Sequence, residues 1–190
     1  MGTAFNHLKE DHEYIKKSLI IFKRIFMYSE PREIFNNEDL SECVKFNIVF
    51  TNMNHSGKED HILYKSFIEK GISTTISEEI NKFIDEHKLF NEFIQNVRDS
   101  LSDNPQALVS PGFIAGIREY IDHMEDHITN ENVILFPTIE DFLSDKEQDY
   151  FCKQFDMHEA HIMESCGNKD IKINIDLLYQ KYSWYTQHIW

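Results

Sequence analysis

The sequence predicts an all-α protein, an antiparallel up-and-down four-helix bundle with two additional C-terminal helices. Three observations support this fold class: apolar residues recur at intervals of three and four, no long segment alternates as a strand would, and the 190 residues include only six Gly and four Pro. Short connections between long helices make neighbours antiparallel. We expect a single domain over residues 1–190, with the bundle over about 3–140 and a helical extension over about 141–190.

The first two helices are expected over residues 3–28 and 38–70. An apolar stripe extends from Phe5 to Phe26, and Ser29-Glu30-Pro31 ends the first helix. Gly71 follows the second helix, where glycine is a typical C-terminal stop because it adopts the left-handed conformation without strain.

The third and fourth helices have signals at both ends. Residues 74–77 supply Thr and Ser caps for the third helix, and Ser102-Asp103-Asn104-Pro105 breaks it. Ser110-Pro111 is an N-cap followed by proline at the first helical position, and Pro137 is expected to close the fourth helix.

The C-terminal extension contains two further helical segments. Ser144 and Glu147 form the pattern of a capping box, which starts a fifth helix. A last helix is expected over about Ile175–Ile189.

Charge and cysteine content exclude several functional classes. The net charge of −14, from 33 acids and 19 bases, argues against nucleic-acid binding and against an anionic membrane surface. No segment has the roughly 18 apolar residues of a membrane span, and the N-terminal residues do not resemble a signal peptide. Three scattered Cys without Cys-x-x-Cys disfavour disulfide scaffolds and cysteine-bound clusters, and a cytoplasmic location is expected.

Two windows of the sequence share one pattern: His, three residues, Glu, two residues, then Ile-Leu and an aromatic residue. They begin at His55 and His127, and their carboxylates are Glu59 and Glu131. Residues four apart lie on one face of a helix, so each window turns an imidazole and a carboxylate the same way. The apolar residues expected on the same inward stripes are Ile48 and Ile62 for the first window and Tyr120 and Ile134 for the second.

A lone histidine on each of the other two bundle helices extends the repeat. His12 follows Asp11, and His87 follows Glu86, each between apolar residues of the inner stripe. His87 lies 75 residues after His12, and His127 lies 72 residues after His55. The chain therefore contains two related helical hairpins, each of which supplies a lone His and a His-x-x-x-Glu pair.

Inward carboxylates in a bundle core are costly unless cations lie between them. Four imidazoles and two carboxylates form a ligand set for two first-row metal ions, with iron or manganese favoured, zinc possible, and magnesium or calcium disfavoured. No His has an acid three residues before it, and there is no His-Glu-x-x-His, which disfavours ferritin-like and zincin sites. The candidate metal ligands are His12, His55, Glu59, His87, His127 and Glu131, with His123, one turn before His127, as either a fifth imidazole or a partly exposed neighbour.

These four motifs resemble the hemerythrin-like family, also called the HHE cation-binding domain, over about residues 3–140. The resemblance implies an antiparallel four-helix bundle with two iron ions in a carboxylate-bridged, non-heme centre. Oxygen-carrying members have a second histidine where Phe83 stands, one turn before His87. They also have a His and an Asp five residues apart, whereas His127 and Glu131 are four apart. Both departures count against reversible oxygen transport.

The function expected from the resemblance is binding of O2, NO or peroxide for oxygen or redox sensing, storage or detoxification. A di-iron oxidoreductase acting on peroxide or nitric oxide, or an iron-donating repair protein, is the first alternative. The second alternative is a structural helical bundle in which the metals only stabilise the fold. The partners left open are a second copy of the chain, as a homodimer, and a separate signalling protein.

Several neighbouring residues have competing interpretations. For Asp11 and Glu86 a solvated role is favoured over contact with an imidazole, because adjacent helical residues do not face each other. A solvated face is likewise favoured for His158 and Glu159 over a role in closing the site from outside the bundle. Gly57 is expected to allow close approach near the metals, and for Tyr120 core packing is favoured over a hydrogen bond to a bound ligand.

Overall fold

The computed structural model describes residues 3–27, 36–103, 108 and 110–183, and these residues form helices and short connections without a strand. The all-α prediction is therefore confirmed. The segments are α1 (Ala4–Met27), α2 (Asn37–Phe46), η1 (Asn47–Ser56), η2 (Glu59–Tyr64), α3 (Lys65–Glu69), α4 (Thr74–Asp103), α5 (Pro111–Asn130), η4 (Glu131–Leu135), α6 (Phe136–Glu140), α7 (Asp145–Ser165) and α8 (Ile171–Ser183), where η denotes a π-helix.

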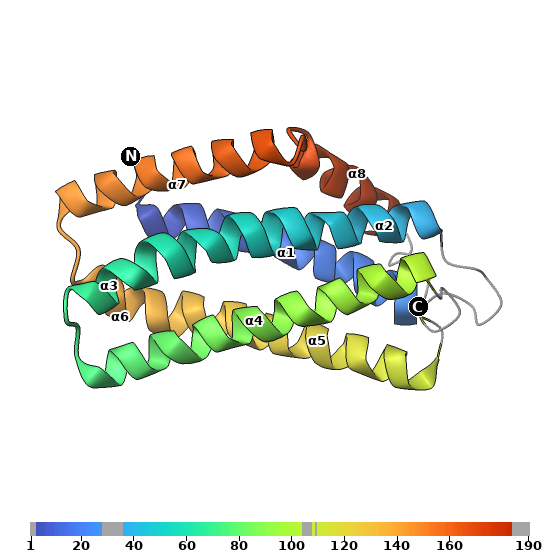
Figure 1. The fold of residues 1–190 in the computed structure, drawn as a ribbon, viewed down its shortest axis with the longest axis horizontal. Helices are drawn as coiled ribbons and strands as arrows, with labels where there is room; N and C mark the ends of the chain where they lie inside the picture. Colours follow the sequence, from blue (N-terminus) through green and yellow to red (C-terminus); the bar gives the residue numbers. More distant parts are fainter. Residues whose placement is uncertain (1–2, 28–35, 104–107, 109, 184–190) are drawn as a thin grey trace.

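The helices lie lengthwise against one another (Figure 1). The segments from α2 to α3 follow one another as one rod, and α5, η4 and α6 form another. Helix α1 packs on η1 and on α5, and α4 packs on the same two rods. Helices α7 and α8 cover α1 from outside, and α7 also contacts η1 and η2.

The helix ends follow the local sequence where the structure describes them. The Ser110 hydroxyl accepts a hydrogen bond from the Phe113 backbone amide at 3.3 Å, as an N-cap should. Ser144 and Glu147 form the expected capping box at the start of α7. Gly71 ends α3 with a φ of 74°, which glycine adopts without the strain that a Cβ atom would cause.

Other helix boundaries differ from the prediction or fall outside the residues that the structure describes. The helix continues past Pro137 to Glu140, because Pro137 stands in the first turn after a π-helical segment, where its missing amide costs little. The last helix begins at Ile171, not at Ile175. The predicted breaks at residues 29–31 and 104–105, and the end of the last helix, fall outside the described residues.

The π-helical turns change which residues point inward after each glutamate. Ile134 is 57 % exposed, so its placement on the inner stripe was wrong, whereas Ile62 is half-buried and packs against one of the core clusters. Leu63 and Leu135 are buried instead. A π-turn accommodates an extra residue, so the inward face shifts by one position along the sequence.

The apolar core is divided into two clusters with a polar layer between them. On α1, for example, Leu8 belongs to one cluster and Ile15 to the other, with His12 between them. The same order holds on α4, where His87 lies between Phe83 and Phe90. Each rod thus carries its histidine at the boundary between the two clusters, which places the polar side chains at one level of the fold.

None of the described helices is long and apolar enough to cross a membrane.

Candidate metal centre

The structure brings six of the seven predicted ligands together at this level. They come from six segments: His12 from α1, His55 from η1, Glu59 from η2, His87 from α4, His127 from α5 and Glu131 from η4. All six are buried. They form two groups, His12–His55–Glu59–Glu131 and His87–His127–Glu131, in each of which the potential ligand atoms lie within 4.8 Å of one another.

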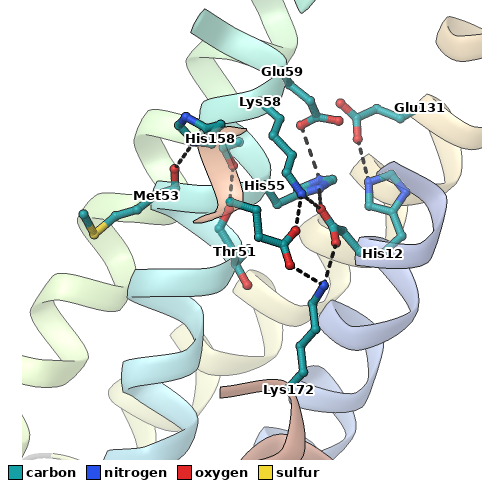
Figure 2. Close-up of polar contacts among 12 residues, drawn as sticks. His12, Thr51, Met53, His55, Lys58, Glu59, Glu131, His158 and Lys172 are labelled. Carbon is teal, nitrogen blue, oxygen red and sulfur yellow. Dashed lines mark hydrogen bonds and ion pairs between the residues drawn. The ribbon is translucent and has the colours of Figure 1, made fainter. Parts of the chain in front are cut away.

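The two carboxylates lie between the two pairs of imidazoles. Glu59 Oε2 is 3.3 Å from His55 Nε2 and 3.4 Å from His87 Nε2. Glu131 Oε2 is 3.2 Å from His12 Nε2 and 3.4 Å from His127 Nε2. One oxygen of each glutamate therefore faces an imidazole of both groups. Figure 2 shows the first group, with the two glutamates side by side above His55 and His12.

Several inward polar atoms lack a hydrogen-bond partner among the described residues. They include His12 Nε2, both oxygens of Glu59, and Glu131 Oε2. Buried polar atoms without partners are rare in native proteins, because each costs on the order of 1–3 kcal/mol. Metal ions coordinated by these atoms would remove that cost, so the residues present fit a metal centre.

The electrostatics of the glutamate pair point the same way. Burial raises the pKa of Glu59 well above its usual range, and the Glu131 charge raises it further. Burial also opposes ionisation of Glu131, but the imidazoles of His127 and His12 outweigh it and hold its pKa below the usual range. Without cations, two adjacent buried carboxyl groups do not both ionise. Cations between them would allow both to carry charge.

The outer nitrogen of each imidazole faces an oxygen from a different helix. The pairs of Nδ1 and oxygen are His12 with Asn132 at 3.1 Å, His55 with Asp11 at 3.6 Å, His87 with Asp60 at 2.8 Å, and His127 with Glu86 at 2.6 Å. The hydrogen-bonding contacts of His12, His87 and His127 fix the orientation of these rings and leave Nε2 as the inward nitrogen, whereas His55 Nδ1 has no hydrogen-bond partner among the described residues.

These contacts correct the predicted roles of Asp11 and Glu86. Adjacent residues on one helix do not face each other, but Asp11 and Glu86 each reach the histidine of a neighbouring helix. The sequence reasoning missed Asp60 and Asn132 altogether. A signal was present: in both repeats, the residue directly after the glutamate carries a side-chain oxygen.

A buried lysine connects this centre to the C-terminal helices. Lys58 Nζ donates to Asp11 Oδ2 at 2.8 Å and to Glu159 Oε2 at 2.7 Å. Lys172 on α8 donates to the other oxygen of Glu159 at 2.7 Å. Figure 2 shows Lys58 and Lys172 converging from the two sides of this network. Glu159 therefore touches the centre indirectly, through Lys58, and α7 and α8 are held by charge as well as by packing.

The pKa of Asp11 predicts an acid-dependent loss of stability. Burial opposes its ionisation, but His55 and Lys58 outweigh burial and lower the pKa of Asp11 from its usual range to about 2. A lowered carboxyl pKa stabilises the fold above about pH 4, and this contribution is lost as the pH falls towards 2. We expect metal-free wild type to lose about 2 kcal/mol more than Asp11→Asn between pH 5 and 2, measured by urea unfolding. Equal losses would contradict this assignment.

A tyrosine hydroxyl orients one of the two glutamates. Tyr64 is fully buried, and its hydroxyl donates to Glu131 Oε1 at 2.5 Å. Tyr64→Phe keeps the ring and removes the donor, so we expect the free energy of unfolding to fall by about 1–3 kcal/mol. Tyr120→Phe is the matched control, because the Tyr120 hydroxyl is 3.4 Å from its acceptor on Asn47. Chemical denaturation of both variants should show the larger loss for Tyr64→Phe, and equal losses would refute the role.

The remaining predicted candidates lie outside the cluster. His123 is exposed and belongs to neither group, and it lines a hollow of about 530 Å³ between α4 and α5. His158 Nε2 donates to the Met53 carbonyl at 3.0 Å. A Cβ atom on Gly57 would lie 2.7 Å from that nitrogen, so Gly57 permits the approach of α7 rather than of a metal. Tyr120 stacks on Phe93 at 4.8 Å, in agreement with a packing role.

Comparison with known proteins agrees with this geometry. The family model named hemerythrin HHE cation binding domain matches residues 3–139 of the sequence, which include all six clustered residues. No curated protein and no solved structure matches the chain. The matched range covers most of the 190 residues, and the chain belongs to the hemerythrin HHE cation-binding domain family.

Proposed function

We propose that this chain is a non-heme di-iron protein that binds O2, NO or peroxide for oxygen or redox sensing, storage or detoxification. One observation carries the proposal: Glu59 and Glu131 each place an oxygen without a hydrogen-bond partner between imidazoles of both groups. A carboxylate in that position can bridge two ions. A ligand set of imidazoles and carboxylates suits iron.

The proposal includes the arrangement of the helices. We infer a single domain over residues 1–190, in which α1, the α2–α3 rod, α4 and the α5–α6 rod form an antiparallel four-helix bundle. The packing of α1 and α4 on both other rods supports this arrangement. In such a bundle, ligands from all four rods meet at one level of the core.

The six clustered residues would hold the iron, and iron bound there would supply a change of redox state and a position for a small ligand. The chain itself orients the imidazoles through their outer oxygen partners and encloses the centre with apolar rings. Phe83 and Phe90 lie 5.1 and 5.2 Å from the His127 ring, measured between centroids. Apolar walls exclude water and favour small uncharged ligands over organic substrates.

Anaerobic reconstitution with ferrous iron tests this function. After metal analysis, optical spectra are recorded as O2, NO or peroxide is added, and azide is added to the oxidised protein. We expect ligand-dependent changes in visible absorption that saturate at a fixed amount of ligand per chain. Two bound ions with spectra that no ligand alters would indicate a structural role, and sustained consumption of peroxide or NO would indicate an oxidoreductase. Either result would overturn the proposed binding function.

A further inference from the structure

We propose that the hollow between α4 and α5 is a second ligand site, outside the metal centre, which binds a small aromatic amine. The two helices lie side by side (Figure 1), and the hollow between them measures about 530 Å³. That volume is within the range of pockets that hold small organic molecules. The inference goes beyond the proposed function, because binding in this hollow requires no iron.

The floor of the hollow is aromatic. Phe93 and Tyr120 line it and stack on each other, with ring centroids 4.8 Å apart and planes 15° apart. Phe90 stands edge-on to Tyr120, at a centroid distance of 5.8 Å. Leu89 adds an apolar side chain that is 63 % exposed at the edge of the hollow. A flat apolar ligand body would pack on these rings and cover Leu89.

A glycine keeps this aromatic floor accessible. Gly116 lies on α5, one turn before Tyr120, and lines the hollow. A Cβ atom on Gly116 would meet Phe93 Cε2 at 3.5 Å, which is an ordinary contact. A longer side chain at this position would therefore extend across Phe93 and occupy the hollow, whereas glycine leaves that space to a ligand.

The rim of the hollow is acidic. Glu86 from α4 and Glu119 and Asp126 from α5 line it, and its described lining residues include no lysine or arginine. A concave site lined by charges of one sign attracts ligands of the opposite sign. Aromatic rings also attract cations through the negative charge of their faces. The rim and the floor together therefore favour a ligand with an aromatic body and an ammonium group.

One rim carboxylate is shared with the metal centre. Glu86 Oε2 is 2.6 Å from His127 Nδ1, and the Glu86 side chain is 46 % exposed. Lys82 also interacts electrostatically with Glu86, but it is paired with Glu79 at 2.8 Å and does not line the hollow. An amine in the hollow would thus touch a residue that orients one imidazole of the centre. Glu119 and Asp126 supply the negative charge that is independent of the centre.

Calorimetric titration of the full-length protein with tryptamine tests the proposal. Two matched probes carry the same indole body: tryptophol has a hydroxyl in place of the ammonium group, and indole-3-propionate has a carboxylate. We expect one saturable site per chain for tryptamine, with a Kd below about 1 mM, and binding at least about tenfold weaker for the other two probes. The titration does not depend on bound iron, so its failure and the failure of the proposed function are distinguishable.

The matched pair Gly116→Leu and Gly112→Leu localises the site. Both glycines belong to α5, and a Cβ atom on Gly112 would meet nothing within 4 Å. The two substitutions remove a glycine from the same helix, but only Gly116→Leu fills the hollow. We expect Gly116→Leu to weaken tryptamine binding by at least about tenfold and Gly112→Leu to keep the wild-type Kd. Circular dichroism checks that both variants fold.

A second pair, Asp126→Asn and Asp122→Asn, tests the charge of the rim. Both acids are exposed on α5, but Asp122 does not line the hollow. We expect Asp126→Asn to weaken tryptamine binding by up to about fivefold, as for an exposed ion pair, and Asp122→Asn to have no effect. This pair decides the question if Gly116→Leu fails to fold.

Several outcomes would overturn the inference. They are the absence of saturable tryptamine binding below about 1 mM, equal binding of the three indole probes, and equal losses within either pair of variants. A dimer in sedimentation that Gly116→Leu converts into a monomer would also overturn it, because a second copy of the chain would then cover the hollow.

Discussion

Replacing Glu59 by Gln is expected to abolish the stabilisation that metal binding gives this protein. Glu59 is fully buried, and neither of its oxygens has a hydrogen-bond partner among the described residues. At free iron a thousandfold above the dissociation constant, binding stabilises the wild type by about 4 kcal/mol. The variant loses a carboxylate oxygen that faces an imidazole of each group, and it should gain little. Urea unfolding with and without ferrous iron measures the difference.

The metal-free protein should behave in the opposite way. Burial raises the pKa of Glu59, so its carboxyl group is held there at a cost when no cation is near. We therefore expect metal-free Glu59→Gln to be at least as stable as metal-free wild type. Glu79→Gln, which alters an exposed acid on α4, is the control and should keep the full gain on iron binding. An undiminished gain in Glu59→Gln would remove this residue from the centre.

Replacing Lys58 by Met is expected to cost about 3–5 kcal/mol of the free energy of unfolding. The ammonium group is 1 % exposed and forms ion pairs with Asp11 and Glu159. Methionine fills much of the same space but leaves the buried Asp11 carboxylate without its nearest cation. The effect on α7 should be visible separately, as faster proteolysis within residues 145–165, because Glu159 also loses a partner.

The control for this substitution is an exposed ion pair. Lys88→Met breaks the ion pair between Lys88 and Asp85, and both of these side chains are exposed. Exposed ion pairs contribute at most about 1 kcal/mol to the free energy of unfolding. Chemical denaturation of the two variants in parallel should give a several-fold larger loss for Lys58→Met. Comparable losses would show that the buried network contributes no more than a surface pair.

The sequence was sufficient to predict which six polar side chains cluster in the core, because their spacing repeats. His55 and Glu59 are four residues apart, as are His127 and Glu131, and a four-residue spacing has a direct meaning on a helix. The six clustered residues could therefore be selected without knowledge of how the helices pack. Capping at Ser110 and Ser144 was predictable for the same reason, since caps depend on a few neighbouring residues.

Contacts between helices could not be predicted in this way. Asp11 reaches His55 and Glu86 reaches His127 because of how neighbouring rods are rotated, which spacing along one helix does not specify. Lys58 has the pattern of an exposed lysine until α7 covers it with Glu159. His123 failed to join the cluster because, although it lies one turn from His127, its side chain falls on the exposed edge of α5.

The π-helical turns were a further limit. Helical periodicity of 3.6 residues placed Ile62 and Ile134 inside, but π-turns at η2 and η4 bury Leu63 and Leu135, leave Ile62 half-buried and expose Ile134. Both turns begin at a glutamate of the cluster. The irregularity thus occurs at the candidate centre itself, where structural context outweighs local propensity.

The central claim is that six inward side chains hold two metal ions, and the number of ions per chain tests it most directly. Protein is dialysed anaerobically against ferrous iron, and bound iron is measured by elemental analysis for wild type, Glu131→Gln and the control Glu79→Gln. We predict two iron ions per chain in the wild type and in the control, and fewer than one in Glu131→Gln. A wild type that retains one ion or none, or a Glu131→Gln protein that retains both, would contradict the account.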